Sequence, residues 1–232
     1  MTGLPEWLRP LAEAIPTVTG DYFSRFLPPA AGGRASAVLV LFGEGETGPD
    51  LLLIERASTL RSHAGQPAFP GGAQDPDDDG PVGAALREAH EEVGVDPASV
   101  TVVGTLPALW LPPSGFVVHP VVGWWQQPHH VEVVDVAEVA AVVRVPLAEL
   151  VDPANRFRVG HPSGIIGPAF DVRGMVVWGF TAGLIAGILR LGGWEQPWDT
   201  DRIRPLDPET LRLALESRRL PVTAQEIHQG DR

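Results

Sequence analysis

The stretch Arg87-Glu88-Ala89-His90-Glu91-Glu92-Val93-Gly94 decides how the rest of this sequence is interpreted. Glu88, Glu91 and Glu92 stand at i, i+3 and i+4, so a helix places all three carboxylates on one face. A different stripe of apolar residues can pack on a sheet, and it consists of Val82, Ala85, Leu86, Ala89 and Val93. The pattern therefore predicts an amphipathic helix from about residue 82 to residue 93.

Like charges on one helix face repel, and each exposed pair costs roughly a few tenths of a kcal/mol. A hard divalent cation converts this repulsion into binding, because Mg²⁺ prefers oxygen ligands and retains waters that a substrate can replace. Arg87 precedes Glu91 by four residues, so it can hold that carboxylate from the same helix. The alternative is a solvated acidic helix face, and the helix alone favours neither interpretation.

The loop in front of this helix favours a ligand site. Phe69-Pro70-Gly71-Gly72 predicts a tight backbone turn, and glycine allows a ligand to approach the chain closely. Four aspartates follow and lie near the positive end of the helix dipole. We interpret three of them as parts of a solvated loop, namely Asp75, Asp77 and Asp79.

The composition limits the classes of function. The 232 residues carry a net charge of −12, which argues against sequence-tolerant nucleic-acid binding because phosphate neutralisation needs clustered Lys and Arg. The absence of cysteine excludes disulfides and thiolate zinc sites and is compatible with a cytoplasmic location. The longest apolar run, residues 175–189, is shorter than the roughly 20 residues of a membrane helix, so no membrane association is expected.

Strand and helix patterns predict an α/β protein in which a mixed sheet lies between helices, an α/β/α sandwich. We expect an N-terminal extension in residues 1–35, one domain in residues 36–195 and a C-terminal extension in residues 196–232. A second strong helix is expected at residues 181–191, with Thr181 as its N-cap. Strands are expected at residues 36–42, 51–55, 100–106, 116–125, 139–145, 170–172 and 175–178, a turn at 146–150, and weaker helices at 6–15 and 208–216.

The helix and the turn before it resemble the signature of the Nudix hydrolases. That signature runs Gly, five residues, Glu, seven residues, and then Arg-Glu-apolar-any-Glu-Glu-any-Gly-apolar. Residues 87–95 match every position of its second half. From Gly72, five residues lead to Asp78, where the family has Glu, and eight residues rather than seven then precede Arg87. This departure leaves the role of Asp78 open, while the carboxylate helix itself is intact.

A longer stretch, residues 52–72, resembles the motif that marks the coenzyme A diphosphatases within this family. The motif has Leu-Leu-Thr-any-Arg-Ser, then Leu-Arg, a Gly and Phe-Pro-Gly-Gly. Ile54 stands in place of its Thr, and Ala57 stands in place of its Ser. The matching positions are Arg56, Leu60, Arg61, Gly65 and Phe69 to Gly72.

The resemblance implies a Nudix-type sandwich that hydrolyses the diphosphate bond of coenzyme A or an acyl-coenzyme A. It implies Mg²⁺ or Mn²⁺ held by Glu88, Glu91 and Glu92. Arg87 would orient these carboxylates, and Glu138 is our candidate for the general base, with an ordinary surface glutamate as the alternative. Substrate contacts are expected at Arg56, Arg61, Gln66, Phe69, Gly71 and Gly72.

Arg56 and Arg61 concentrate positive charge beside the Gly-Gly turn of an acidic protein. Arginine makes bidentate contacts to phosphate, and coenzyme A carries a 3′-phosphate as well as its diphosphate. The alternative is that these arginines form salt bridges with Glu55 or with the acidic loop. The expected partner is a small nucleotide-like molecule, coenzyme A first, and a homodimer is compatible with the sequence.

Two other functions fit the same motifs. A Nudix hydrolase for ADP-ribose, dinucleotides or nucleoside triphosphates would keep the helix glutamates and lose any preference for the 3′-phosphate. A catalytically silent Nudix-fold binding module usually lacks one or more of these glutamates, whereas Glu88, Glu91 and Glu92 are all present here.

Overall fold

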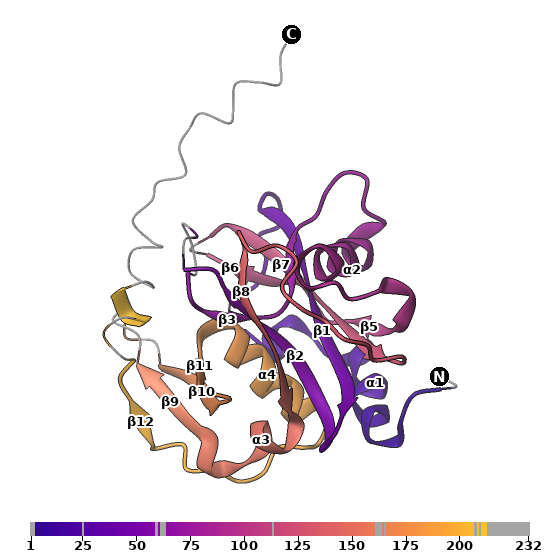
Figure 1. Ribbon diagram of the computed structural model, residues 1–232. Coiled ribbons are helices and arrows are strands. Elements are labelled where there is room, and N and C mark those ends of the chain that lie inside the picture. The colour runs from indigo at the N-terminus through magenta and orange to yellow at the C-terminus, as the bar shows by residue number, and fades with distance from the viewer. Residues whose placement is uncertain are drawn as a thin grey trace.

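The centre of the fold is a long antiparallel hairpin of two apolar strands, β1 (Arg34–Gly45) and β2 (Gly48–Arg56) (Figure 1). The computed structural model describes residues 3–24, 26–58, 60, 64–112, 114–160, 164, 166–206, 208 and 210–212. Leu39 and Val40 are both 0% exposed although they point to opposite faces of β1. A strand that is apolar on two faces forms the middle layer of a sandwich, because each face needs a cover.

The main sheet is mixed, since β1 pairs in parallel with β7 (Phe116–Trp125) and antiparallel with β2. β8 (Val139–Pro146) pairs with β2 and β5 (Val100–Thr105) pairs with β7, both antiparallel. Shorter strands complete the sheet, namely β3 (Pro67–Ala68) on β2, β4 (Gly71–Ala73) on β1 and β6 (Leu109–Leu111) on β7. Because β4 holds both glycines of the predicted turn, that segment is fixed against β1.

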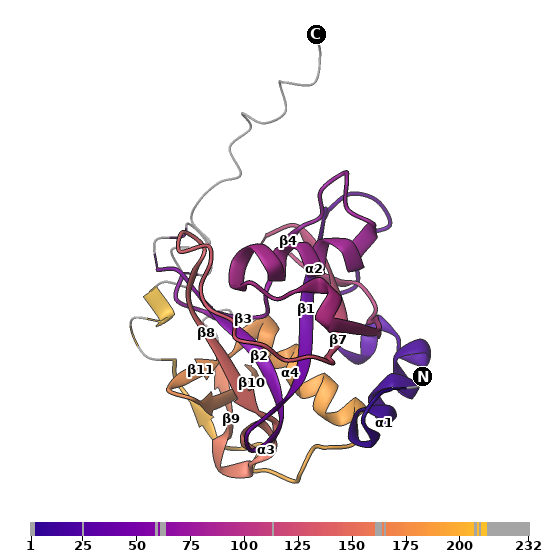
Figure 2. The same ribbon diagram turned by 45° about the vertical axis from the view of Figure 1, so that its right-hand side comes forward.

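Helices cover both faces of this sheet, and they are α1 (Arg9–Ala14), α2 (Gly80–Val93), α3 (Leu147–Val151) and α4 (Gly179–Leu191). On one face, Ala89 of α2 belongs to the same buried cluster as Leu39. On the other face, α1 and α4 share a cluster with Val40. Figure 2 shows α2 and α4 on opposite sides of β1, so the predicted α/β/α sandwich is confirmed.

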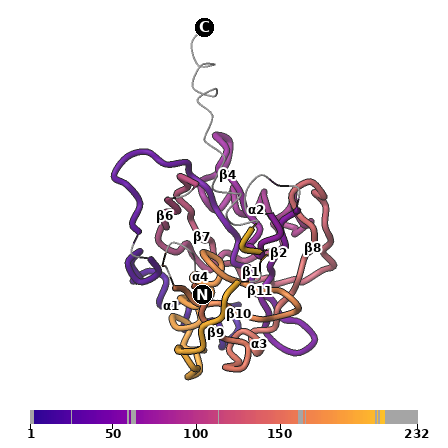
Figure 3. The backbone as a smooth tube through the Cα atoms, turned by 90° about the vertical axis from the view of Figure 1, so that its left-hand side faces the viewer, coloured from indigo at the N-terminus to yellow at the C-terminus, as the bar shows by residue number. Residues whose placement is uncertain are grey.

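A smaller sheet lies beside the sandwich in the order β11-β10-β9-β12, and its strands are β9 (Arg156–Gly160), β10 (Ile166–Val172), β11 (Met175–Val177) and β12 (Ile203–Arg204). The hairpin of β10 and β11 confirms the pair expected at residues 170–172 and 175–178. β9 was not among the expected strands. Figure 3 shows β9, β10 and α3 grouped at the end of the molecule away from α2.

The segment before β1 packs into the core. Leu8 and Leu11 are 0% exposed and join the cluster that α4 forms with the sheet. The helix expected at residues 6–15 is present as α1 with a 3-10 turn on each side. These and the other 3-10 turns are η1 (Glu6–Leu8), η2 (Ile15–Thr17), η3 (Gly20–Tyr22), η4 (Pro97–Ser99) and η5 (Pro153–Asn155).

The structure corrects two local expectations. Thr181 is not the N-cap of α4, because the cap is Trp178 and the Thr181 hydroxyl instead donates to the carbonyl of Pro67 at 3.1 Å. The expected turn at residues 146–150 is largely helical, as α3. Most of the helix expected at residues 208–216 lies outside the described residues. In the described part of the chain, every helix is too short or too polar to cross a membrane.

Candidate active site

The apolar stripe of α2 orients its carboxylates. Ala85 and Ala89 are 0% exposed against the sheet, as the helical spacing predicts. Gly94 ends the helix with a left-handed φ of 73°. The side chains of Glu88, Glu91 and Glu92 are 17%, 56% and 3% exposed, so the three glutamates run from solvent into the protein.

Glu92 is the most buried of the three. Its Oε2 accepts a hydrogen bond from the backbone N–H of Gly71 at 3.0 Å, whereas its Oε1 has no hydrogen-bond partner among the described residues. Burial raises the pKa of Glu92 to about 8, although the Gly71 N–H and the nearby Arg56 guanidinium act in the opposite direction. A buried carboxylate oxygen that accepts no hydrogen bond is costly, so a bound cation or a hydrogen-bond donor would stabilise the protein at this atom.

The two glycines of β4 bring the backbone against α2. Gly71 has a φ of 155°, and a Cβ there would overlap the carbonyl oxygen of Ala37 on β1. A Cβ on Gly72 would lie 2.5 Å from the carboxyl carbon of Glu88. Any larger residue at position 72 would therefore displace the Glu88 carboxylate, which explains why glycine stands there.

Arg87 joins the helix glutamates to the preceding loop. Its Nη1 donates to Glu88 Oε1 at 3.0 Å and to Glu91 Oε2 at 2.9 Å. Its Nε and Nη2 donate to the two carboxylate oxygens of Asp78 at 2.9 and 3.0 Å, and Nη2 also donates to the carbonyl of Ala73 at 3.1 Å. The rigid fork of the guanidinium fixes the direction of both glutamates, which fits the orienting role expected of Arg87.

Asp78 holds Arg87 from the loop. The Arg87 guanidinium lowers the pKa of Asp78, and the backbone N–H of Asp75 also donates to its Oδ2 at 2.8 Å. Both carboxylate oxygens therefore have donors, and the side chain is 6% exposed. The acid that departs from the Nudix-like spacing positions Arg87, and Arg87 in turn positions the glutamates.

Arg56 connects the coenzyme A-like motif to α2. Its Nη1 lies 3.9 Å from Glu92 Oε1, and its Nη2 lies 3.5 Å from Glu138 Oε2. Its backbone N–H donates to the carbonyl of Gln66 at 3.1 Å. Arg56 thus forms ion pairs, but its partners among the described residues are Glu92 and Glu138 rather than Glu55 or the acidic loop.

The donor set fits a hard divalent cation in its chemistry. Glu88, Glu91 and Glu92 offer only oxygen atoms, which Mg²⁺ and Mn²⁺ prefer, and Oε1 of Glu92 accepts no hydrogen bond from the described residues. Burial raises the pKa of Glu88, and Arg87 counteracts this shift. Within the described residues, no three acidic or histidine side chains converge in metal-binding geometry, and Arg87 holds the Glu88 and Glu91 oxygens. A cation at this site requires those two side chains to turn toward Glu92.

The other predicted substrate-binding residues lie in different surroundings. Phe69 is 3% exposed and packs in the core, so its ring supports the turn from inside; the expected contact with substrate does not fit this burial. Gln66 is half-buried, and its carbonyl accepts the N–H of Arg56. Arg61 lies outside the described residues.

Two contacts of the site were not foreseen. The pairing of Asp78 with Arg87 had a signal, because an acid in the loop before a helix can reach an arginine of the first turns. The contact of Arg56 with Glu92 had none, since it depends on how the end of β2 meets α2 in space.

Comparison with known proteins identifies the family of this chain. The NUDIX domain family matches residues 33–163. Nudix hydrolase NudL of Enterobacter sp. (strain 638) is 43% identical over 159 residues, which cover 66% of this chain and 79% of that protein. NudL of Citrobacter koseri is 41% identical over 179 residues, 71% of this chain and 90% of that protein.

The fold is also found among solved structures. The Nudix hydrolase RenU of M. smegmatis superposes with a TM-score of 0.50 at 19% identity, over 73% of this chain and 91% of that one. The chain belongs to the Nudix hydrolase family. It is a hydrolase of phosphorus anhydrides, in a family whose members generally use divalent metals such as Mg²⁺ or Mn²⁺ and bind small nucleotide-like substrates.

Proposed function

We propose that this Nudix hydrolase cleaves the diphosphate bond of coenzyme A or acyl-coenzyme A. The observation that carries the proposal is the position of Arg56, whose guanidinium lies 3.9 Å from Glu92 and 3.5 Å from Glu138. Arg56 belongs to the stretch 52–72 that resembles the coenzyme A diphosphatase motif. That stretch therefore has an arginine, a side chain well suited to binding phosphate, beside the carboxylate helix, which supports the proposal.

In this proposal Glu88, Glu91 and Glu92 hold Mg²⁺ or Mn²⁺. The bound cation would polarise phosphate oxygens and lower the pKa of a bound water. Glu92 is the central ligand because its buried Oε1 has no hydrogen-bond partner among the described residues, although the Arg56 guanidinium lies 3.9 Å away. Gly72 leaves room for the Glu88 carboxylate, and Arg87 directs it.

The reaction is the attack of water on one phosphorus of the diphosphate. The bond from that phosphorus to the bridging oxygen breaks, and the water proton passes to a carboxylate. Glu138 is our candidate for this base, because its side chain is 46% exposed and faces Glu92 across Arg56. The products are 3′,5′-ADP and 4′-phosphopantetheine or its acyl derivative.

Arg56 is the residue that we propose to bind the diphosphate of the substrate. Its ion pairs with two glutamates hold the guanidinium beside the site, and its planar fork can bind a phosphate oxygen pair. Arg61, the other arginine of the motif, is proposed from the sequence alone as a partner of the 3′-phosphate. Together they would favour coenzyme A over an analogue without that phosphate.

The test is a product assay with three substrates. Coenzyme A, 3′-dephospho-coenzyme A and ADP-ribose are each incubated with the full chain and Mg²⁺ or Mn²⁺, and products are separated by chromatography. We expect the largest kcat/KM with coenzyme A and no product in EDTA. A clear preference for ADP-ribose would refute the substrate and leave the family assignment in place, whereas hydrolysis of none of a wider nucleotide panel would indicate a binding module.

A further inference from the structure

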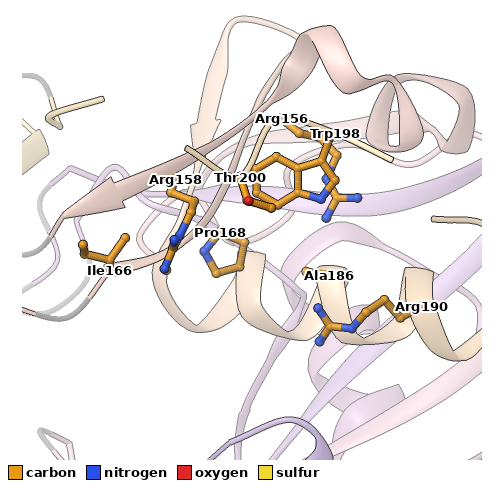
Figure 4. Close-up of a pocket in the computed structure, with 9 residues that line it drawn as sticks. Arg156, Arg158, Ile166, Pro168, Ala186, Arg190, Trp198 and Thr200 are labelled. Carbon is orange, nitrogen blue, oxygen red and sulfur yellow. The ribbon is translucent and has the colours of Figure 1, made fainter. Parts of the chain in front are cut away.

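A second concave site lies on the smaller sheet and α4, apart from the carboxylate helix (Figure 4). Its volume is about 210 Å³, and β9, β10, α4 and the segment after α4 form its walls. Arg156, Arg158 and Arg190 line it together with the ring of Trp198. Its lining residues all lie between positions 156 and 200, so it shares no residue with the proposed active site.

Arg156 is a buried cation without adequate acceptors. It is 1% exposed, and its Nη1 lies 2.8 Å from Glu195 Oε1 in an ion pair that lacks hydrogen-bond geometry. None of its side-chain nitrogens has a hydrogen-bond partner among the described residues. The guanidinium carbon lies 4.5 Å from the ring centroid of Trp198 and 5.2 Å from that of Phe170. The rings stabilise the charge, but the buried N–H donors still lack oxygen acceptors, which is costly.

The other two arginines add positive charge that is not neutralised locally. In the described part of the chain neither Arg158 nor Arg190 has an ion pair, and the guanidinium carbon of Arg190 lies 5.7 Å from the ring centroid of Tyr22. Burial lowers the pKa of Arg156, the Glu195 carboxylate opposes this shift, and the charge of Arg190 adds a smaller lowering. Glu195 is thus the one carboxylate paired with this group of three guanidiniums among the described residues, in a protein whose net charge is −12.

We propose that this pocket binds a phosphate group, held by Arg156, Arg158 and Arg190. Arginine forks match the oxygens of phosphate, and an anion here would supply acceptors to the buried donors. The volume of about 210 Å³ is below the range of roughly 300–1,000 Å³ that is usual for organic ligands. The pocket therefore takes inorganic phosphate, pyrophosphate or the phosphate end of a larger molecule. Trp198 offers a ring on which an attached base can stack.

The test is calorimetric titration of the full chain in EDTA, which measures binding without hydrolysis. The probes are inorganic phosphate, pyrophosphate and AMP at matched ionic strength. We expect saturable binding of at least one probe. Replacing both solvent-accessible arginines, Arg158→Ala with Arg190→Ala, should weaken it by roughly a hundredfold, because each charge-assisted hydrogen bond contributes about a factor of ten.

The matched control removes two positive charges elsewhere, with Arg9→Ala and Arg34→Ala, and should retain the affinity of the unmodified chain. Tighter binding of AMP than of inorganic phosphate, reduced by Trp198→Leu, identifies an organic phosphate as the ligand. Equal binding of the two identifies the free anion. The proposal is overturned if no probe binds, or if the Arg158→Ala and Arg190→Ala variant binds as tightly as the unmodified chain. None of these outcomes depends on the proposed hydrolysis of coenzyme A.

Discussion

Glu92 and Arg156 are buried side chains of opposite charge, and each has polar atoms that lack hydrogen-bond partners among the described residues. Their surroundings differ. Glu92 lies under a glycine-built backbone turn whose N–H donates to one oxygen and leaves the other open. Arg156 lies between the rings of Phe170 and Trp198 and has one carboxylate, Glu195, beside it.

The difference shows two ways in which a fold can hold a charge for a ligand. Near Glu92 the path of the backbone forms the site, because Gly71 and Gly72 lie so close to their neighbours that a Cβ would overlap them. Near Arg156 side chains form the site, because the aromatic rings stabilise the cation and leave its N–H donors available. A buried charged group with polar atoms that make no hydrogen bond costs free energy, so both positions point to a ligand of the opposite sign. The following substitutions separate the two cases.

The largest effect is expected for Glu92→Gln. Removing a carboxylate that, as proposed, holds the cation should cost about 4 kcal/mol of transition-state stabilisation, which corresponds to a loss of about a thousandfold in kcat. Because burial raises the pKa of Glu92 to about 8, the metal-free fold gains little stability from a negative charge at this position, and glutamine keeps the shape of the side chain. Thermal unfolding in EDTA should therefore change little. Glu46→Gln, at an exposed position, is the control for kcat, and an unchanged rate in Glu92→Gln would remove the proposed metal site.

Gly72→Ala tests the shaped backbone. The added Cβ would lie 2.5 Å from the Glu88 carboxyl carbon, so the carboxylate would have to move away. A misplacement of about 1 Å in an active site can cost roughly a hundredfold in kcat. Gly83→Ala, where the nearest atom to a Cβ is 3.4 Å away, adds the same methyl group to α2 and should keep full activity. Equal rates for the two variants would show that the Gly72 contact does not matter. The measurement is steady-state kinetics with coenzyme A, alongside circular dichroism of both variants.

Arg156→Met combined with Glu195→Gln tests whether the buried Arg156 serves a ligand or the stability of the fold. Replacing both members of a buried ion pair usually leaves the free energy of unfolding unchanged or raises it by about 1–4 kcal/mol. Phosphate binding should nevertheless weaken by roughly tenfold, because the buried donors are gone. Denaturant unfolding and calorimetry measure the two quantities on the same sample. A drop in stability of about 3 kcal/mol or more would mean that Arg156 serves the fold rather than a ligand.

Asp78→Asn should have the smallest effect. Asp78 contacts Arg87 and not the open oxygen of Glu92, so the change loosens a positioning residue without removing a metal ligand. We expect kcat to fall by less than about tenfold, with the dependence of the rate on Mg²⁺ concentration unchanged. Asp77→Asn, in the same loop and exposed, controls for the loss of one charge. A thousandfold loss would instead place Asp78 among the ligands.

Local patterns in the sequence were sufficient for the carboxylate helix and the central hairpin. The spacing of Glu88, Glu91 and Glu92 and the apolar stripe through Ala85 and Ala89 predicted α2, because helical periodicity is a property of neighbours along the chain. β9 was missed, although Phe157 and Val159 alternate with Arg156 and Arg158. The alternation does not show that both faces of this strand are covered: Arg156 is 1% exposed and Phe157 is 3% exposed.

The contacts that build the site depend on tertiary structure. Arg56 was expected to bind phosphate or to pair with nearby acids, but its neighbours are Glu92 and Glu138, which the sheet and α2 bring to it. Phe69 looked like part of a ligand-facing turn, yet its ring is buried under that turn. A motif thus indicates which residues share a site without indicating which of them face the substrate.

The hydroxyl of Thr181 connects α4 to the segment before the Gly-Gly turn, and this contact bears on where the domain ends. It reaches from α4 to the carbonyl of Pro67, just before the Gly-Gly turn, although α4 lies past residue 163, where the family match ends. A fragment limited to the matched residues, 33–163, would retain Glu88, Glu91 and Glu92. It would lose the hydrogen bond from Thr181 that holds the segment before the Gly-Gly turn. We therefore expect that a fragment needs α4, through Leu191, to hold the Gly-Gly turn in this position.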